Sequence, residues 1–195
     1  FFSLAENYQL TKEAFKAYYD HLSDNGLLII TRWLDFPPRD SFRVASTLKE
    51  ANIPGLKEKL IAFNGLTTIT FVVSKQAYTG QELHSIEEFA ESMGYDFVYF
   101  QLDFTPNEHN KFPQPYYHDG INRIINDQTS YASNYVFDIS ALTDEKPFFY
   151  DFFKWRTMGA LYALLKQRWQ PFLDSGFLLW FLFAGWLVFS IILAL

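Results

Sequence analysis

The run LLIIT at residues 27–31 decides the fold, because it is apolar on both faces of a strand. Such a run is typical of a central strand that is covered from two sides. The segment Thr11 to Leu22 has apolar residues at helical spacing, and Thr11 suits the cap position. The turn Asp24-Asn25-Gly26 ends this helix. The sequence therefore predicts a helix followed by an interior strand.

A hairpin follows a second helix. Residues 41–51 have a helical pattern, and residues 60–63 and 67–73 are short β-rich runs. Asn64-Gly65 between these runs is the strongest short-range hairpin signal. A helical crossover between parallel strands, followed by an antiparallel hairpin, predicts an α/β fold that is one half of a mixed doubly wound sheet. Three further segments are predicted: a helix at 81–93 closed by Gly94, a short strand at 96–102, and a long connection at 103–146.

Composition excludes several classes of protein. The chain has 195 residues with 16 basic and 22 acidic side chains, a net charge of −6, which argues against a nucleic-acid partner. The absence of cysteine excludes disulfides, thiolate zinc sites and a cysteine nucleophile. The four histidines show no metal-ligand spacing, so no metal site is predicted.

The last part of the chain predicts a membrane anchor. Residues 176–195 contain no charge, and a helix of this length would span ~30 Å, the hydrocarbon thickness of a bilayer. Residues 151–173 predict a basic amphipathic juxtamembrane helix, or alternatively a helix packed on the domain. We therefore expect an integral membrane protein in contact with the lipid bilayer. By the positive-inside rule, residues 1–150 would form a soluble domain on the cytoplasmic side.

Two sequence motifs suggest a family. The first is Leu4-Ala5-Glu6-Asn7-Tyr8, together with Ile29-x-x-Arg32-Trp33, and the second is Thr143-Asp144-Glu145-Lys146-Pro147-Phe148-Phe149. Both resemble membrane-anchored spermidine-synthase-like proteins, which have a class I methyltransferase-type Rossmann domain. The resemblance implies that residues 1–150 are the carboxy-terminal half of that sheet, with its closing antiparallel hairpin. The missing amino-terminal half of the domain would precede Phe1.

The resemblance implies a transferase. The parent protein would transfer an aminopropyl or methyl group from S-adenosylmethionine or its decarboxylated form to a polyamine or another small acceptor. The glycine-rich turn that binds the donor would precede Phe1, and no Gly-x-Gly occurs in the sequence. We therefore expect this chain to bind no cofactor and to be inactive alone, with unknown catalytic residues. The alternative is a non-catalytic, degenerate Rossmann module that serves membrane-associated interaction or regulation.

Substrate-contacting candidates lie where ligands bind in open α/β sheets, outside the carboxyl ends of the strands. Glu6, Asn7 and Tyr8 would follow the missing fourth strand, and Arg32 and Trp33 directly follow the run at 27–31. A carboxylate and a phenol suit an amine substrate, and Arg32 would bind an anion or pair with Glu6. The alternative is structural: Glu6 and Asn7 cap the first helix, and Trp33 packs in the core.

The acids Asp144 and Glu145 are the remaining candidates. Paired acids can act as general acid and base when their surroundings separate their pKa values. They also suit the first turn of a helix, where negative charge is favourable and Pro147 takes an early position.

Overall fold

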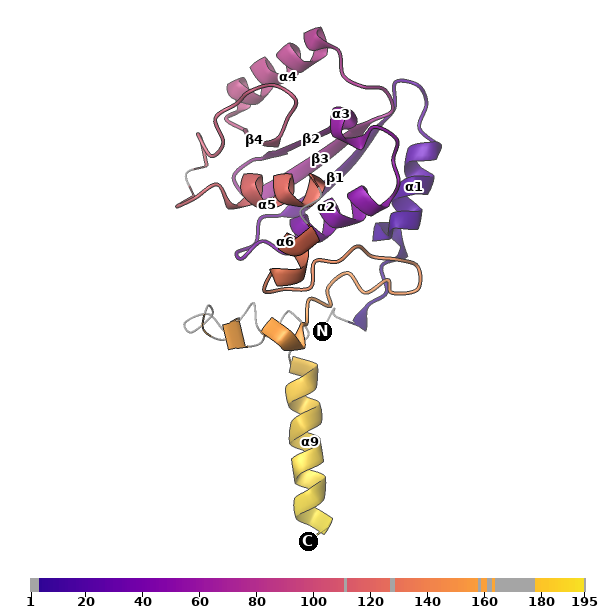
Figure 1. Ribbon diagram of the computed structural model, residues 1–195, viewed down its shortest axis with the longest axis vertical. Helices are drawn as coiled ribbons and strands as arrows, with labels where there is room; N and C mark the ends of the chain where they lie inside the picture. Colours follow the sequence, from indigo (N-terminus) through magenta and orange to yellow (C-terminus); the bar gives the residue numbers. More distant parts are fainter. Residues whose placement is uncertain are drawn as a thin grey trace.

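Four antiparallel strands form the sheet at the centre of the computed structural model (Figure 1), which describes residues 4–110, 112–126, 129–157, 159, 160, 163 and 178–194. Every neighbouring pair of strands is antiparallel, and the order is β1-β3-β2-β4. The predicted hairpin is confirmed: β2 and β3 pair from Leu60↔Val73 to Asn64↔Ile69. The strands are β1 (Leu27–Trp33), β2 (Leu60–Asn64), β3 (Thr68–Ser74) and β4 (Asp96–Tyr99).

The predicted fold class is wrong. The run at 27–31 belongs to β1, which is an edge strand rather than an interior one. Ile30 is buried, but Leu27 is 49% exposed, Ile29 59% and Trp33 70%. The sequence misled because hydrophobic periodicity reports the chemistry of the side chains and not which strands pair. A strand whose side chains are apolar on both faces has the same sequence pattern in the interior of a sheet and at its edge.

Helices lie on both faces of the sheet. Phe15 of α1, Phe42 of α2 and Ile121 of α5 share one core with Phe71 of β3, while Leu83 of α4 packs with Ile61 on the other face. Thr11 caps α1 as predicted, with its hydroxyl accepting from the Ala14 N–H at 3.2 Å. The helices are α1 (Lys12–Asp20), α2 (Asp40–Glu50), α3 (Leu56–Lys59), α4 (Gly80–Met93), α5 (Tyr116–Ile125), α6 (Thr129–Asn134) and α9 (Leu178–Ala194), and the 3-10 turns are η2 (Tyr8–Leu10) and η3 (Trp155–Thr157).

The predicted connection at 103–146 contains two helices, α5 and α6. Pro115 directly precedes α5, and proline is favoured at the start of a helix. In the sequence, this proline indicates a loop. α5 also lies very close to α2: a Cβ atom at Gly120 would stand 2.0 Å from Phe42 Cζ. Glycine at this position therefore lets the two helices make contact.

The prediction of a membrane-spanning helix at 176–195 is also wrong. α9 has 17 residues. Within the described part of the chain, no helix combines the length and the apolar character needed to cross a bilayer. The prediction of an integral membrane protein with its soluble domain on the cytoplasmic side is corrected with it. Contact with a lipid bilayer stays a prediction.

The predicted helix at 151–173 lies largely outside the described residues. Its described start is the single turn η3. Lys154 there donates from Nζ to the backbone oxygens of Ala132 at 3.1 Å and Ser133 at 3.0 Å, at the end of α6. Burial lowers the pKa of the Lys154 ammonium. This basic side chain therefore contacts the domain.

Candidate functional site at the carboxyl end of β1

The two sequence motifs that carry the family resemblance are in contact. The Asn7 N–H donates to the Pro147 oxygen at 2.6 Å, and the Lys12 N–H donates to the Leu142 oxygen at 2.9 Å. The Thr11 hydroxyl donates to Asp144 Oδ1 at 2.6 Å, across 133 positions of sequence. The segment before α1 and the turn at 143–147 therefore form one surface, which we call the acidic rim: Glu6, Tyr8 and Asp144.

The electrostatics of the acidic rim show that its three side chains interact. Tyr8 is half exposed. Its pKa is raised, first by the negative charge of Glu6, then by partial desolvation and by the hydrogen bond with that carboxylate, and last by the charge of Asp144. The phenol therefore keeps its proton beside two carboxylates. An exposed cluster of this kind favours a cationic ligand.

Asp144 is held in place by two side chains at the start of α1. Thr11, which is fully buried, both caps α1 and donates to the carboxylate. The Asp144 N–H donates to Glu13 Oε2 at 3.1 Å on the first turn of α1. Hydrogen bonds to the start of α1 therefore fix the position of this carboxylate, in addition to the turn itself.

Glu145 lies on the other side of the turn. With Lys146 it lines a cavity of about 420 Å³, whose other side includes Arg43. The two adjacent acids therefore do not form an acid–base pair. The segment is not the start of a helix either, because the Lys146 N–H donates to the Thr143 oxygen at 2.9 Å in a tight turn.

The other predicted site residues have separate surroundings. Arg32 Cζ lies 4.7 Å from the centroid of the Phe149 ring, and among the described residues no ion pair joins Arg32 to Glu6. Trp33 is exposed at the end of β1, so it is not a core residue. The Asn7 side chain donates to the Ala5 oxygen at 2.8 Å and does not cap α1.

Arg43 is a structural residue that the sequence did not single out. Its side chain is 3% exposed, and its guanidinium donates to the Phe149 oxygen at 2.6 Å and to the Asp151 oxygen at 2.8 Å. Burial lowers the pKa of Arg43 to about 10, offset in part by Asp138, Asp151 and Asp40. Arg43 fastens the segment at 148–151 to α2. Its signal in the sequence is a basic residue between two apolar residues of the helix.

Two partly buried carboxyls lie between the end of β1 and the start of α2. Asp35 Oδ2 accepts from Arg39 Nε at 2.9 Å, and Asp40 Oδ1 lies 3.9 Å from the same nitrogen. Burial first, and then the charge of Asp40, raises the pKa of Asp35 to about 7, against the opposing effect of Arg39. Burial also raises the pKa of Asp40. The Tyr117 hydroxyl closes this cluster by donating to the Asp35 backbone oxygen at 2.6 Å.

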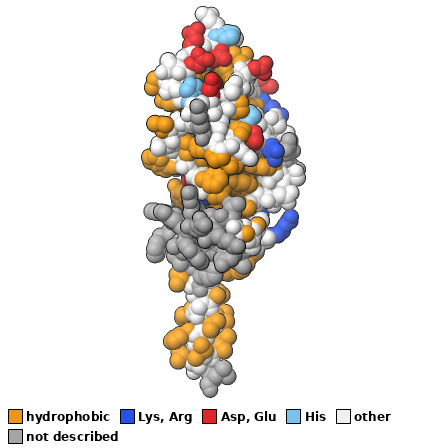
Figure 2. Space-filling model, turned by 90° about the vertical axis from the view of Figure 1, so that its left-hand side faces the viewer, with side chains coloured by type: hydrophobic (Ala, Val, Ile, Leu, Met, Phe, Trp, Pro, Cys, Tyr) orange, Lys and Arg blue, Asp and Glu red, His pale blue; other side chains and the backbone are white. Residues whose placement is uncertain are grey.

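A second acidic surface lies between α4 and β4. A cavity of about 220 Å³ there is lined by five carboxyl groups, together with aromatic rings and His109. Figure 2 shows acidic side chains gathered at the end of the molecule that carries α4. Asp96 is buried and accepts from the His109 N–H at 2.8 Å and the Asn110 N–H at 2.6 Å, so this acid fixes a loop. The five are Glu87, Glu91, Asp96, Asp103 and Glu108.

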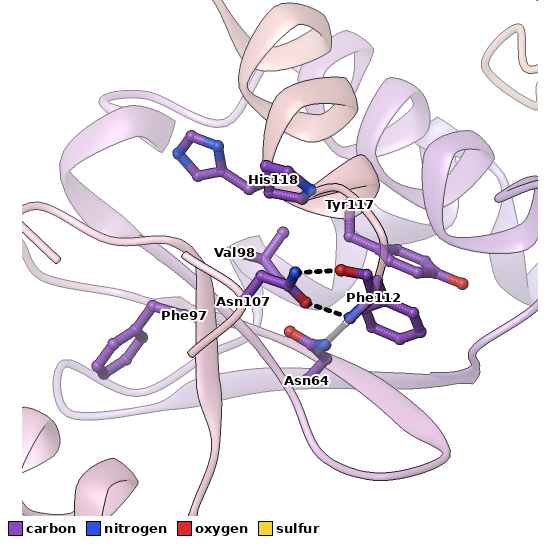
Figure 3. Close-up of a pocket in the computed structure, with 8 residues that line it drawn as sticks. Asn64, Phe97, Val98, Asn107, Phe112, Tyr117 and His118 are labelled. Atoms are coloured by element: carbon purple, nitrogen blue, oxygen red, sulfur yellow. Dashed lines mark hydrogen bonds between the residues drawn. The ribbon is translucent and has the colours of Figure 1, made fainter. Parts of the chain in front are cut away.

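The neighbouring pocket in Figure 3 is structural. Asn107 and Phe112 exchange two hydrogen bonds, Nδ2 to the oxygen at 2.7 Å and the N–H to Oδ1 at 2.8 Å. The enclosed space of about 10 Å³ has room for one water at most. In the described residues no three histidine or acidic side chains are placed to hold a metal ion.

Comparison with known proteins gives no assignment. No family model, no curated protein and no solved structure matches this chain.

Proposed function

We propose that the acidic rim binds the ammonium group of a small amine, and that the chain is the acceptor-binding part of a transferase with an S-adenosylmethionine-type donor. The observation that carries the proposal is the convergence of Glu6, Tyr8 and Asp144 from two segments more than a hundred residues apart. The reaction would be the aminopropyl or methyl transfer that the family resemblance implies.

The chemistry of the acidic rim suits a protonated amine. An ammonium group has three donors and no acceptor. The rim offers carboxylate oxygens of Glu6 and Asp144 and the neutral phenol oxygen of Tyr8, whose pKa is raised further by these acids. Hydrogen bonds in which a partner is charged are the stronger kind. A diamine or polyamine acceptor fits this donor–acceptor pattern better than an anion does.

The donor is not assigned to residues of this chain. The donor site would lie in the amino-terminal half of the same domain, which the resemblance implies as a partner. Group transfer requires the amine to give its proton to the surrounding water before its lone pair attacks the carbon next to the donor sulfur. An N–C bond then forms, the C–S bond breaks, and the neutral thioether leaves with the electron pair. The acidic rim would orient the amine, and the donor bound in the amino-terminal half would supply the carbon that is attacked.

The test is calorimetric titration of the protein with putrescine, a diamine probe. Glu6→Gln and Asp144→Asn should each weaken binding about fivefold, because removing an exposed carboxylate charge costs ~1 kcal/mol. Asp144→Asn keeps an oxygen that accepts from Thr11. Glu88→Gln, an exposed acid of α4 outside the acidic rim, is the matched control and should leave the affinity unchanged. Equal affinities in all three variants would overturn the proposal.

The alternative is a non-catalytic interaction module. The uncovered edge of β1 favours it, because an exposed strand edge binds other strands. Titration of the chain assembled with its amino-terminal half discriminates the two functions. Heat on adding S-adenosylmethionine or its decarboxylated form supports the transferase, and no heat from either supports the module.

A further inference from the structure

The cavity of about 420 Å³ next to Arg43 has walls that α2 holds in place. The guanidinium of Arg43 donates to the backbone oxygens of Asp138 and Asp151, the latter at 2.8 Å. A third segment of the lining is anchored through the Leu142 N–H, which donates to the buried Thr47 hydroxyl at 3.2 Å. Buried groups of α2 therefore fix the shape of this cavity before any ligand enters it.

Charged side chains of both signs line this cavity. Glu145 and Lys146 belong to the turn at 143–147, whereas Asp138 and Asp151 belong to the segments that are held by α2. Among the described residues, no ion pair joins Lys146 to any of these three carboxylates. An ammonium group and three carboxylates therefore line the same space without forming an ion pair with one another.

Asp138 and Asp151 form the acidic part of the lining. Burial raises the pKa of Asp151; the Phe153 N–H and Arg43 oppose this effect, and the negative charge of Asp138 adds to it. The two Nη groups of Arg43 already donate to two backbone oxygens each, and the nearer of them lies 3.9 Å from Asp138 Oδ2. A further positive charge in the cavity would relieve the repulsion between the two carboxylates.

We propose that this cavity binds a small zwitterion, a molecule that carries both an ammonium group and a carboxylate. The ammonium group donates to Asp138 and Asp151, and the carboxylate accepts from Lys146. A volume of about 420 Å³ is typical of small-molecule sites. A ligand with only a positive charge leaves Lys146 unpaired, and a ligand with only a negative charge meets three carboxylates. This inference does not depend on amine binding at the acidic rim.

The test is calorimetric titration of the protein with 4-aminobutanoate, butylamine and butanoate. These probes share a four-carbon chain and carry both charges, the ammonium group alone and the carboxylate alone. Because Lys146 makes no ion pair with the carboxylates, a zwitterion with separated charges suits the cavity. 4-Aminobutanoate should bind about tenfold more tightly than either control. Equal affinity for butylamine or butanoate, or no binding of 4-aminobutanoate, would overturn the proposal.

Two substitutions separate the two ends of the ligand. Lys146→Gln should weaken binding of 4-aminobutanoate about fivefold and leave butylamine unchanged, because only the ligand carboxylate loses its partner. Asp151→Asn should weaken 4-aminobutanoate and butylamine alike, and it keeps the backbone oxygen that accepts from Arg43. Lys57→Gln, an exposed lysine of α3 outside the cavity, is the matched control and should bind as the wild type does. Wild-type affinity for 4-aminobutanoate in Lys146→Gln would contradict the assignment of the carboxylate.

The place of binding distinguishes this cavity from the acidic rim. In NMR spectra, saturating 4-aminobutanoate should shift the amide resonances of Ser140 and Ala141, which line the cavity, and leave the ring resonances of Tyr8 unmoved. A shifted Tyr8 with unmoved Ser140 and Ala141 would place the ammonium group at the acidic rim and overturn the inference. Failure of putrescine to bind the acidic rim would leave these expected shifts unchanged.

Discussion

Replacing Asp35 by asparagine should change how stability depends on pH. The side chain is 20% exposed, its carboxylate accepts from Arg39 Nε at 2.9 Å, and burial together with Asp40 raises its pKa to about 7 from 3.8. The folded state therefore holds this proton more tightly than the unfolded state does. The stability that the protonated group contributes is fully present below about pH 4 and is lost as the pH rises through about 7.

The magnitude follows from the same shift. A difference of about three pKa units corresponds to ~4 kcal/mol, which is an upper bound for this group. Because Asp40 is also buried and interacts with the same guanidinium, the two carboxyls titrate as a pair and part of the effect belongs to Asp40. We expect about 1–3 kcal/mol of the wild-type stability to be lost between pH 5 and 8 through Asp35.

The assay is urea unfolding at pH 5, 6, 7 and 8. The wild type should lose stability over this range, and Asp35→Asn should lose less and become the more stable protein at pH 8, because its neutral amide carries no buried charge. Asp24→Asn, an exposed acid between α1 and β1, is the control and should follow the wild type. If the free energy of unfolding changes equally with pH in the wild type and in Asp35→Asn, the reasoning is refuted.

Three further substitutions test the packing. Gly120→Ala should destabilise the protein by about 1–3 kcal/mol, because its Cβ would stand 2.0 Å from Phe42 Cζ; an unchanged melting temperature would contradict the contact. Arg43→Met should cost about 3–5 kcal/mol in urea unfolding, since four backbone oxygens lose their donor, and a loss below 1 kcal/mol would contradict the fastening role. Thr11→Val should cost about 1 kcal/mol through the lost cap and also weaken putrescine binding, whereas Thr11→Ser should restore both.

Signals that act within a few residues predicted local structure well. The hairpin was predicted, but its turn lies at Leu66 and Thr67 rather than at Asn64-Gly65, because Asn64 pairs with Ile69 and the Gly65 N–H donates to the Thr68 oxygen. Thr11 caps α1, and Gly94 ends α4 in the left-handed region with φ of 64°. Each of these residues acts on backbone groups of its immediate neighbours. The sequence alone therefore contains the whole interaction.

Features that depend on distant pairing were not predictable. The run at 27–31 has the composition of an interior strand, yet β3 covers only one of its edges. The guanidinium of Arg43 donates to backbone oxygens 95 to 108 positions away, and any residue type supplies such an oxygen. In the proposed site, the sequence named the segments of Glu6 and Asp144 as candidates, but their contact requires the turn at 143–147 to fold against α1.

The amine-binding role of the acidic rim is tested most directly by NMR of the protein with its tyrosines labelled at Cζ. Putrescine should shift the Tyr8 resonance in a saturable manner, and the uncharged analogue 1,4-butanediol should not. The opposite pattern, an unmoved Tyr8 and a shifted Tyr95 in the cavity beside α4, would place the amine at the second acidic surface and contradict the proposed site.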